Sequence, residues 1–368
     1  EADVKTFLKI AAFLLCCLAG VSLWLWHEAA SFLETPARAD GREIYFDVPK
    51  GASLSAVADS LAKAGLVSDA RKFRLYARFK GDGKSLQAGR FAMNTGWTPP
   101  RVLDELVNGK PALNRLTVPE GLTWWQTGRL LAANGLARFE DFRDVIHDPA
   151  FLRRYGIPFA NAEGFLMPDT YLLRPADAPP EDAAAREAFW KERARAMAGR
   201  MIDNFWRKSA TLWPGAAGKS AAWPVQLRPD DATLRTLMTL ASIVEKETAI
   251  DAERPRVAGV YHNRIRIGMP LQADPTVIYG MGPNFAGPLL RSHLEDKANP
   301  YNTYQLRGLP PGPIASFGMA ALKAAIQPEA NDYYYFVAKT DGGAHRFSRT
   351  LAEHNEAVRA YQMQKRGK

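Results

Sequence analysis

The sequence predicts an α+β protein with an N-terminal transmembrane helix, a small α+β module and a larger mixed α+β domain. One apolar run near the N-terminus predicts the membrane helix. Two segments that begin seventy residues apart share a strand–turn–helix pattern, which predicts a chain that alternates strands and helices. Beyond them, helical periodicity alternates with loops rich in proline and glycine. The 368 residues are enough for two or three domains beside an anchor.

The membrane helix is predicted over residues 7–26, which read FLKIAAFLLCCLAGVSLWLW. This run has about the 20 residues that a helix needs to cross a hydrocarbon core. Trp24 and Trp26 stand where an aromatic belt would hold the far interface. A cleaved signal peptide is the alternative, but the small-residue pattern at 37–39 lies too far beyond the run. We therefore expect an uncleaved anchor with residues 1–6 in the cytoplasm.

Composition narrows the possible functions. The formal net charge of +9 favours polyanions in general, but the cations are scattered and no nucleic-acid motif accompanies them. The two cysteines, Cys16 and Cys17, both fall inside the apolar run, so they offer the rest of the chain neither a disulfide nor a zinc site. The six histidines form no HExxH motif. We therefore expect no metal, no cofactor and no nucleic-acid partner.

An internal repeat follows a polar tether, which we place at residues 27–42. Val-Pro-Lys-Gly at 48–51 opens the first copy and Val-Pro-Glu-Gly at 118–121 opens the second. Each copy predicts a strand, a glycine turn and a short helix that ends at Gly65 or Gly135.

The first copy continues into a small module, residues 43–113. Its pattern predicts a second helix at 69–78, a strand at 89–94 and a further helix at 100–108. The strand–helix–helix–strand part resembles a LysM module, a small fold that grips polymers containing N-acetylglucosamine. A spacer module without a ligand is the alternative.

A helix from about Ala232 to Thr248, capped by Asp230 or Asp231, carries an acidic residue on its apolar face. Glu245 lies on that stripe, whereas Glu247 is about 200° away, so this helix alone cannot place both carboxylates in one cleft. Burial would favour the protonated form that a general acid needs. From spacing alone, the alternative is a buried structural carboxylate paired with an arginine such as Arg264 or Arg266. The stripe consists of Leu234, Leu237, Met238, Ala241 and Val244.

Six stretches of the sequence together resemble one enzyme family, the endolytic murein transglycosylases, also called the YceG-like or MltG family. They are EGFLMPDTY (163–171), LASIVEKET (240–248), RIGMPLQADPTVIYGMG (266–282), NPYNTYQLRGLPPGPI (299–314), YYYFVAKTDGGAHRFS (333–348) and EHNEAV (353–358). Their order and spacing match the family. The resemblance implies a catalytic domain over residues 114–368 with its core at 160–361, behind the LysM-like module.

The resemblance also implies the chemistry. In that family the glutamate of the SIVEKE segment is catalytic, which corresponds to Glu245. The family cleaves the β-1,4 bond between N-acetylmuramic acid and N-acetylglucosamine, and it forms 1,6-anhydro-N-acetylmuramic acid ends that terminate strand elongation. One carboxylate is enough for this route because the 6-hydroxyl of the sugar is the nucleophile. A muramidase-type hydrolase and a non-catalytic peptidoglycan-binding scaffold are the alternatives.

Further expectations follow from the same resemblance. The substrate is peptidoglycan glycan strands, and peptidoglycan synthases of the inner membrane are expected partners. The protein would span the bacterial inner membrane once, with its catalytic domain in the periplasm. We expect substrate-binding roles for Glu163, Gln272, Asp274, Tyr301, Asn302 and Glu247.

Overall fold

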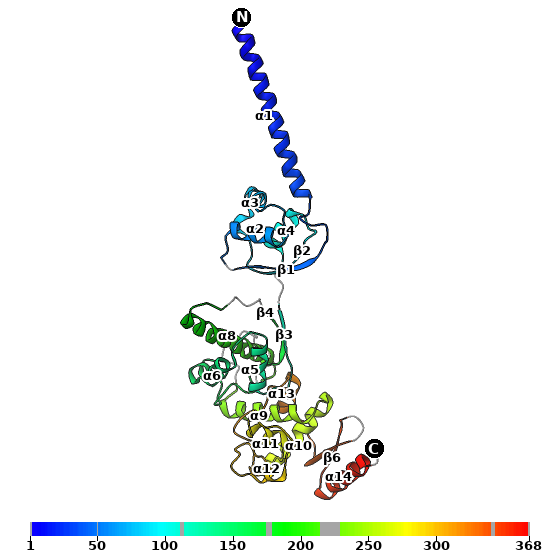
Figure 1. Cartoon of the computed structure of the whole chain (residues 1–368). Helices are drawn as coiled ribbons and strands as arrows, with labels where there is room; N and C mark the ends of the chain where they lie inside the picture. The colour runs from blue at the N-terminus through cyan, green and yellow to red at the C-terminus, as the bar shows by residue number, and fades with distance from the viewer. Residues whose placement is uncertain are drawn as a thin grey trace. The chain divides into compact units, whose positions relative to one another are not determined.

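The computed structural model describes residues 2–49, 51–110, 114–173, 179–213, 229–339 and 343–366 (Figure 1). The chain divides into two compact units. The first contains Glu1–Arg115 and Leu172–Asp177, and the second contains Leu116–Tyr171 and Ala178–Lys368. Helices and three two-stranded sheets make up the described residues, so the prediction of a mixed α+β fold is confirmed.

Helix α1 spans Ala2–Glu34, and among the described residues it is the one helix long and apolar enough to cross a membrane. The candidate span is Leu14–Glu34. The helix continues eight residues beyond the predicted run, into the region predicted as a tether. Two contacts explain this difference, because Phe32 is buried in the core of the first unit and Glu28 forms an ion pair with Lys72.

The first unit continues with the predicted order of strand, helix, helix and strand. Strands β1 and β2 pair antiparallel, with Phe46 opposite Phe91 and both side chains buried. Gly65 ends α2 with φ +71°, and the backbone N–H of Leu66 donates to the Leu61 carbonyl. The resemblance to LysM stays a prediction. The elements are β1 (Glu43–Val48), α2 (Leu54–Lys63), α3 (Ala70–Phe79), a 3-10 turn (Asp82–Lys84), β2 (Gly89–Asn94) and α4 (Pro99–Asn108).

The second copy of the repeat leads into the second unit and has the same helix ending. Gly135 has φ +64°, and the Leu136 N–H donates to the Leu131 carbonyl, as at the first copy. Strands β3 and β4 form a two-stranded sheet, and α6 packs against α5 and α8. The elements are β3 (Asn114–Val118), α5 (Trp124–Ala133), α6 (Phe139–His147), α7 (Pro149–Arg154), β4 (Asp169–Leu173) and α8 (Ala183–Ser209).

Helix α9 (Asp231–Glu247) packs against α10, α11 and α13 in the rest of the second unit. Asp230 caps it by accepting a hydrogen bond from the Thr233 N–H. Every residue from Leu237 to Val244 is buried, because neighbouring helices cover more than the predicted stripe. The remaining elements are a 3-10 turn (Asp251–Glu253), α10 (Arg254–Arg266), α11 (Asp274–Gly280), α12 (Arg291–Glu295), α13 (Met319–Ile326), β5 (Tyr335–Ala338), β6 (His345–Ser348) and α14 (Leu351–Arg366).

Candidate active site

Glu245 lies in the last turn of α9, with a side chain only 6% exposed. Its Oε1 accepts a hydrogen bond from Arg254 Nη2 at 3.0 Å, and its Oε2 accepts one from the backbone N–H of Gly318 at 3.1 Å. Gly318 is the N-cap residue of α13. Both carboxylate oxygens are therefore held by donors from two other segments, which fixes the direction of the side chain.

The arginine that pairs with Glu245 is Arg254, so the alternative that named Arg264 or Arg266 has the wrong partner. The turn after α9 brings the first residue of α10 back beside the last turn of α9. Arg264 is about 15 Å farther along α10 at 1.5 Å per residue. Its guanidinium donates instead to the carbonyls of Tyr334 and Leu271.

A second carboxylate, that of Glu120, lies at the same arginine. Its Oε2 is 3.9 Å from Arg254 Nη2, and its side chain is half exposed. Burial and then the charge of Glu245 raise the pKa of Glu120, while Arg254 opposes the change. The glycine at 318 permits this approach, because a β-carbon there would overlap Glu120 Oε1. Glu120 and Glu245, which are distant in sequence, thus share one buried guanidinium, and Asp251 also forms an ion pair with it.

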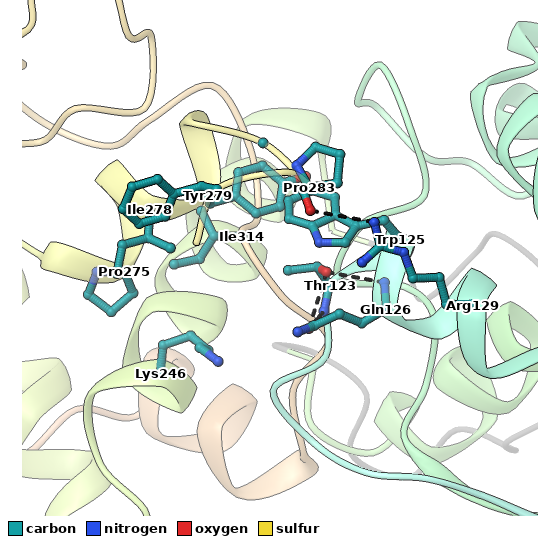
Figure 2. Close-up of a pocket in the computed structure, with 12 residues that line it drawn as sticks. Thr123, Trp125, Gln126, Arg129, Lys246, Pro275, Ile278, Tyr279, Pro283 and Ile314 are labelled. Carbon is teal, nitrogen blue, oxygen red and sulfur yellow. Dashed lines mark hydrogen bonds between the residues drawn. The ribbon is translucent and has the colours of Figure 1, made fainter. Parts of the chain in front are cut away.

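A cavity of about 360 Å³ is lined in part by Lys246, the residue that follows Glu245 on α9 (Figure 2). The rings of Trp125 and Tyr279 form part of its wall, with centroids 4.9 Å apart. Two cations border it: Arg129, which donates to the Pro283 carbonyl, and Lys246. The other lining residues are Thr123, Gln126, Pro275, Ile278, Gly282, Pro283, Phe285 and Ile314. Aromatic walls with a few placed polar groups are typical of sites for small organic groups.

Lys246 joins the cavity to the carboxylate cluster. It follows Glu245 directly on α9, and its Nζ donates to the Gly121 carbonyl at 3.1 Å. Gly121 in turn follows Glu120. The end of α9 and the loop after β3 therefore each supply one of the carboxylates and one residue of the cavity lining, Lys246 and Thr123.

Glu163 lies behind the aromatic wall and is 1% exposed. Its Oε2 accepts a hydrogen bond from the Trp124 N–H at 2.9 Å. Burial raises the pKa of Glu163 to about 8, although the Trp124 N–H and the nearby Tyr279 hydroxyl oppose the change. Tyr301 lies on the same side, with its ring centroid 4.8 Å from that of Tyr279. Glu163 and Tyr301 are not among the residues that line the cavity, but each lies next to one that does.

Glu247 points to the other side of α9, as the helical spacing predicts. Burial raises the pKa of its carboxyl to about 7, and the negative charge of Asp274 adds to this, while Tyr261 and Arg264 oppose it. Asp274 Oδ1 accepts a hydrogen bond from the Tyr304 hydroxyl at 2.6 Å. Among the described residues, this polar cluster and Glu245 have different hydrogen-bond and ion-pair partners.

Two more predicted residues belong to the loops around α11. Gln272 is exposed and has φ +50°, a left-handed conformation that is uncommon outside glycine. Its N–H donates to the Thr303 carbonyl at 3.1 Å, which holds it there. Asn302 is fully buried, and its Nδ2 donates to the carbonyls of His293, Leu294 and Asp296. Asn302 therefore braces its loop, and any contact of these side chains with substrate stays a prediction.

The chain that forms this site also matches a known family. The sequence profile of the YceG-like family fits residues 46–360. The chain belongs to the YceG-like family. That match covers both units and includes Glu120, Glu163, Glu245 and the cavity wall.

Relatives with assigned functions support the same family membership. The endolytic murein transglycosylase of Bacillus subtilis is 30% identical over 349 residues, which cover 90% of this chain and 88% of that protein. The endolytic murein transglycosylase of Streptococcus pneumoniae R6 is 27% identical, and the match covers 97% of this chain but 65% of that protein. The crystal structure of a YceG-like protein from Listeria monocytogenes is similar, with a TM-score of 0.51, 27% identity, and coverage of 86% of this chain and 100% of that one.

The sequence patterns do not single out several residues that this YceG-like site uses. Glu120 is visible in sequence only as the acid of Val-Pro-Glu-Gly, at the position where the first copy of the repeat has Lys50. The change from a lysine to a glutamate in an otherwise similar turn is the sequence signal that could have pointed to Glu120. Arg254, Trp125 and Tyr279 carry no comparable signal, because only the packing of distant segments brings them together.

Proposed function

We propose that this YceG-like protein is an endolytic peptidoglycan lytic transglycosylase. It cleaves the β-1,4 bond between N-acetylmuramic acid and N-acetylglucosamine inside nascent strands and leaves 1,6-anhydro ends, so it terminates strand elongation. The observation that carries the proposal is the buried Glu245 carboxylate, held by Arg254 and Gly318, while the next residue, Lys246, lines an aromatic cavity. The curated relatives that are named endolytic murein transglycosylases support it.

In the proposed reaction Glu245 acts twice. As an acid it gives its proton to the glycosidic oxygen while the bond from that oxygen to the anomeric carbon of N-acetylmuramic acid breaks. As a carboxylate it then accepts the proton of the 6-hydroxyl while O6 bonds to the same anomeric carbon. Glu245 regains its proton, and no water is consumed. The contacts from Arg254 and Gly318 keep the carboxyl group in one orientation through both steps.

Glu120 is proposed as a positioning residue. Its carboxylate shares Arg254 with Glu245, so it helps to fix the position of the guanidinium that holds Glu245.

The cavity is proposed to hold a sugar next to the bond that is cut. The faces of Trp125 and Tyr279 suit the C–H face of a pyranose ring. Arg129 and Lys246 offer positive charge to a carboxylate of the muramic acid side chain or its peptide. Residues 43–113 are proposed as the LysM-like module that grips the strand.

Localisation and partners complete the proposal. Helix α1 anchors the protein in the bacterial inner membrane, with the N-terminus in the cytoplasm and residues 114–368 in the periplasm as the catalytic domain. Peptidoglycan synthases of that membrane are the proposed protein partners, because they make the strands that the enzyme would cut.

The test is the mass of the products from purified glycan strands. We expect anhydro ends, which are lighter than reducing ends by one water, from the unaltered protein. Glu245→Gln should bind strands and release none of these products. Glu140→Gln, an exposed carboxylate on α6, is the matched control and should cut normally. Strand binding without cleavage by the unaltered protein would contradict the proposal and favour a scaffold.

One observation favours a second candidate, a muramidase-type hydrolase. Such enzymes use two carboxylates, and Glu120 supplies one beside Glu245. If Glu120 activated a water molecule, the products would carry reducing ends and would incorporate one oxygen from ¹⁸O-labelled water. Anhydro ends without ¹⁸O would exclude this role for Glu120.

A further inference from the structure

Helix α3 of the first unit exposes large apolar side chains. Leu75 is 72% exposed and Phe79 is 89% exposed, whereas Phe73 and Ala77 on the same helix are fully buried. At about 100° per residue, Leu75 and Phe79 lie about 40° apart and at least about 120° from Phe73. One face of α3 thus packs into the core of the unit, and another face exposes two apolar side chains.

Basic residues flank this apolar face. Helix α3 reads ARKFRLYARF, with four cations and no acid inside the helix. Arg71 and Arg78 are exposed on one side of Leu75 and Phe79, and Lys72 lies on the other side. Two carboxylates near the helix have other partners. Asp69 caps the helix N-terminus, and Asp59 lies 4.0 Å from Arg74. This face of α3 therefore combines exposed apolar side chains with positive charge. That combination is typical of a helix that lies in a membrane interface.

The same helix is tied to the end of the membrane helix. Lys72 Nζ lies 2.6 Å from Glu28 Oε2, and Glu28 follows Trp26 by only two residues on α1. Phe32, one turn farther along, is packed into the core of the first unit. Figure 1 shows α3 on the side of the unit from which α1 runs and β1 on the opposite side. The apolar face of α3 is thus close to the level at which α1 would leave a bilayer.

We infer that α3 lies on the outer surface of the membrane that α1 spans, with Leu75 and Phe79 inserted among anionic lipids. Arg71 and Arg78 would face the phosphate groups of the headgroups, while Lys72 keeps its ion pair with Glu28. Side chains on such a helix reach about 5–10 Å into the boundary between headgroups and acyl chains. The inference rests on the proposed role of α1 as an anchor. It adds a second membrane contact that holds the first unit against the bilayer.

The test uses the full chain in lipid nanodiscs, with Cys16 and Cys17 replaced by serine. A single cysteine introduced by Phe79→Cys carries an environment-sensitive fluorophore. Tyr45→Cys is the matched control, because Tyr45 is an equally large ring, 70% exposed, on β1. We expect blue-shifted emission at position 79 in discs with phosphatidylglycerol, and quenching by lipids that carry a shallow nitroxide at least about twice that at position 45.

Three outcomes decide the inference. Emission at position 79 that matches water-exposed position 45 in anionic discs would overturn it. Arg71→Glu with Arg78→Glu should reverse the blue shift in anionic discs; an unchanged shift would overturn the role of anionic lipid. Quenching of Trp24 and Trp26 by the same lipids checks the anchor separately. If those tryptophans are not quenched, the proposed anchor fails and the inference fails with it.

Discussion

Replacing Glu163 by glutamine should stabilise the second unit at neutral pH. The carboxyl group is fully buried behind the aromatic wall of the cavity, and burial raises its pKa from 4.5 to about 8. In the unfolded chain the same group ionises near 4.5, so unfolding at neutral pH releases a proton. The contribution of Glu163 to stability is therefore fully present below pH 4.5 and is lost as pH rises towards about 8. Glutamine has the shape of the protonated acid and no such dependence.

The size of the effect follows from the two pKa values. At pH 7, about 2.5 units above its pKa, the carboxyl of the unfolded chain is almost fully ionised. The carboxyl of the folded protein is still mostly protonated. This difference in ionisation lowers the free energy of unfolding by about 3 kcal/mol. In a unit of this size that corresponds to a rise in melting temperature of about 6–12 °C. The gain for Glu163→Gln should shrink to about 0.4 kcal/mol at pH 4.5, where the folded carboxyl is protonated and the unfolded one is half protonated.

The assay is thermal unfolding of the two proteins in detergent from pH 4.5 to 8, followed by tryptophan fluorescence. Glu140→Gln is the control, because Glu140 is exposed on α6 and should show no difference that grows with pH. A gain for Glu163→Gln that stays constant over this range would refute the reasoning. A loss of stability at pH 7 would show that the charged carboxylate is the form the fold needs.

Four other variants test the site. Glu245→Gln should lower strand cleavage by more than about 100-fold with binding retained, measured by product release and by co-sedimentation with strands; cleavage within about threefold of normal would remove Glu245 from the reaction. Glu120→Gln should lower kcat by roughly 10-fold and leave KM nearly unchanged, because Arg254 would lose one of the carboxylates that fix its position beside Glu245. An unchanged kcat would contradict a positioning role for Glu120. Gly318→Ala should lower kcat by about 10–100-fold because the new β-carbon displaces Glu120, with an unchanged melting temperature as the check on folding. Trp125→Ala should raise KM for strands by roughly 2–10-fold and leave kcat nearly unchanged, and a fall in kcat alone would argue against a binding role for the cavity.

Much of the local structure could be predicted from the sequence because its determinants are close together in the chain. Asp230 caps α9 at the predicted end, and Gly65 and Gly135 end their helices in the left-handed conformation. Helical spacing also placed Glu245 and Glu247 on different sides of α9, and their separate partners agree with that. Caps, turns and periodicity act within a few residues, so they can be read without knowledge of the fold.

The environment of each carboxylate could not be predicted in this way. The sequence offered Arg264 or Arg266 as partners for Glu245, but the turn after α9 brings Arg254 there instead. Helix α1 also extends past the predicted apolar run, because Phe32 and Glu28 find contacts in the first unit that a hydropathy pattern does not contain.

The sequence by itself determined the element order of the first unit, the buried face that carries Glu245, and the family that its segments resemble. Only the tertiary structure decided that Glu120 shares Arg254 with Glu245 and that Trp125 and Tyr279 wall a cavity beside them. The physical reason is the distance along the chain over which each interaction acts. Secondary structure depends on neighbours along the chain, whereas ion pairing and burial depend on which distant segments pack together.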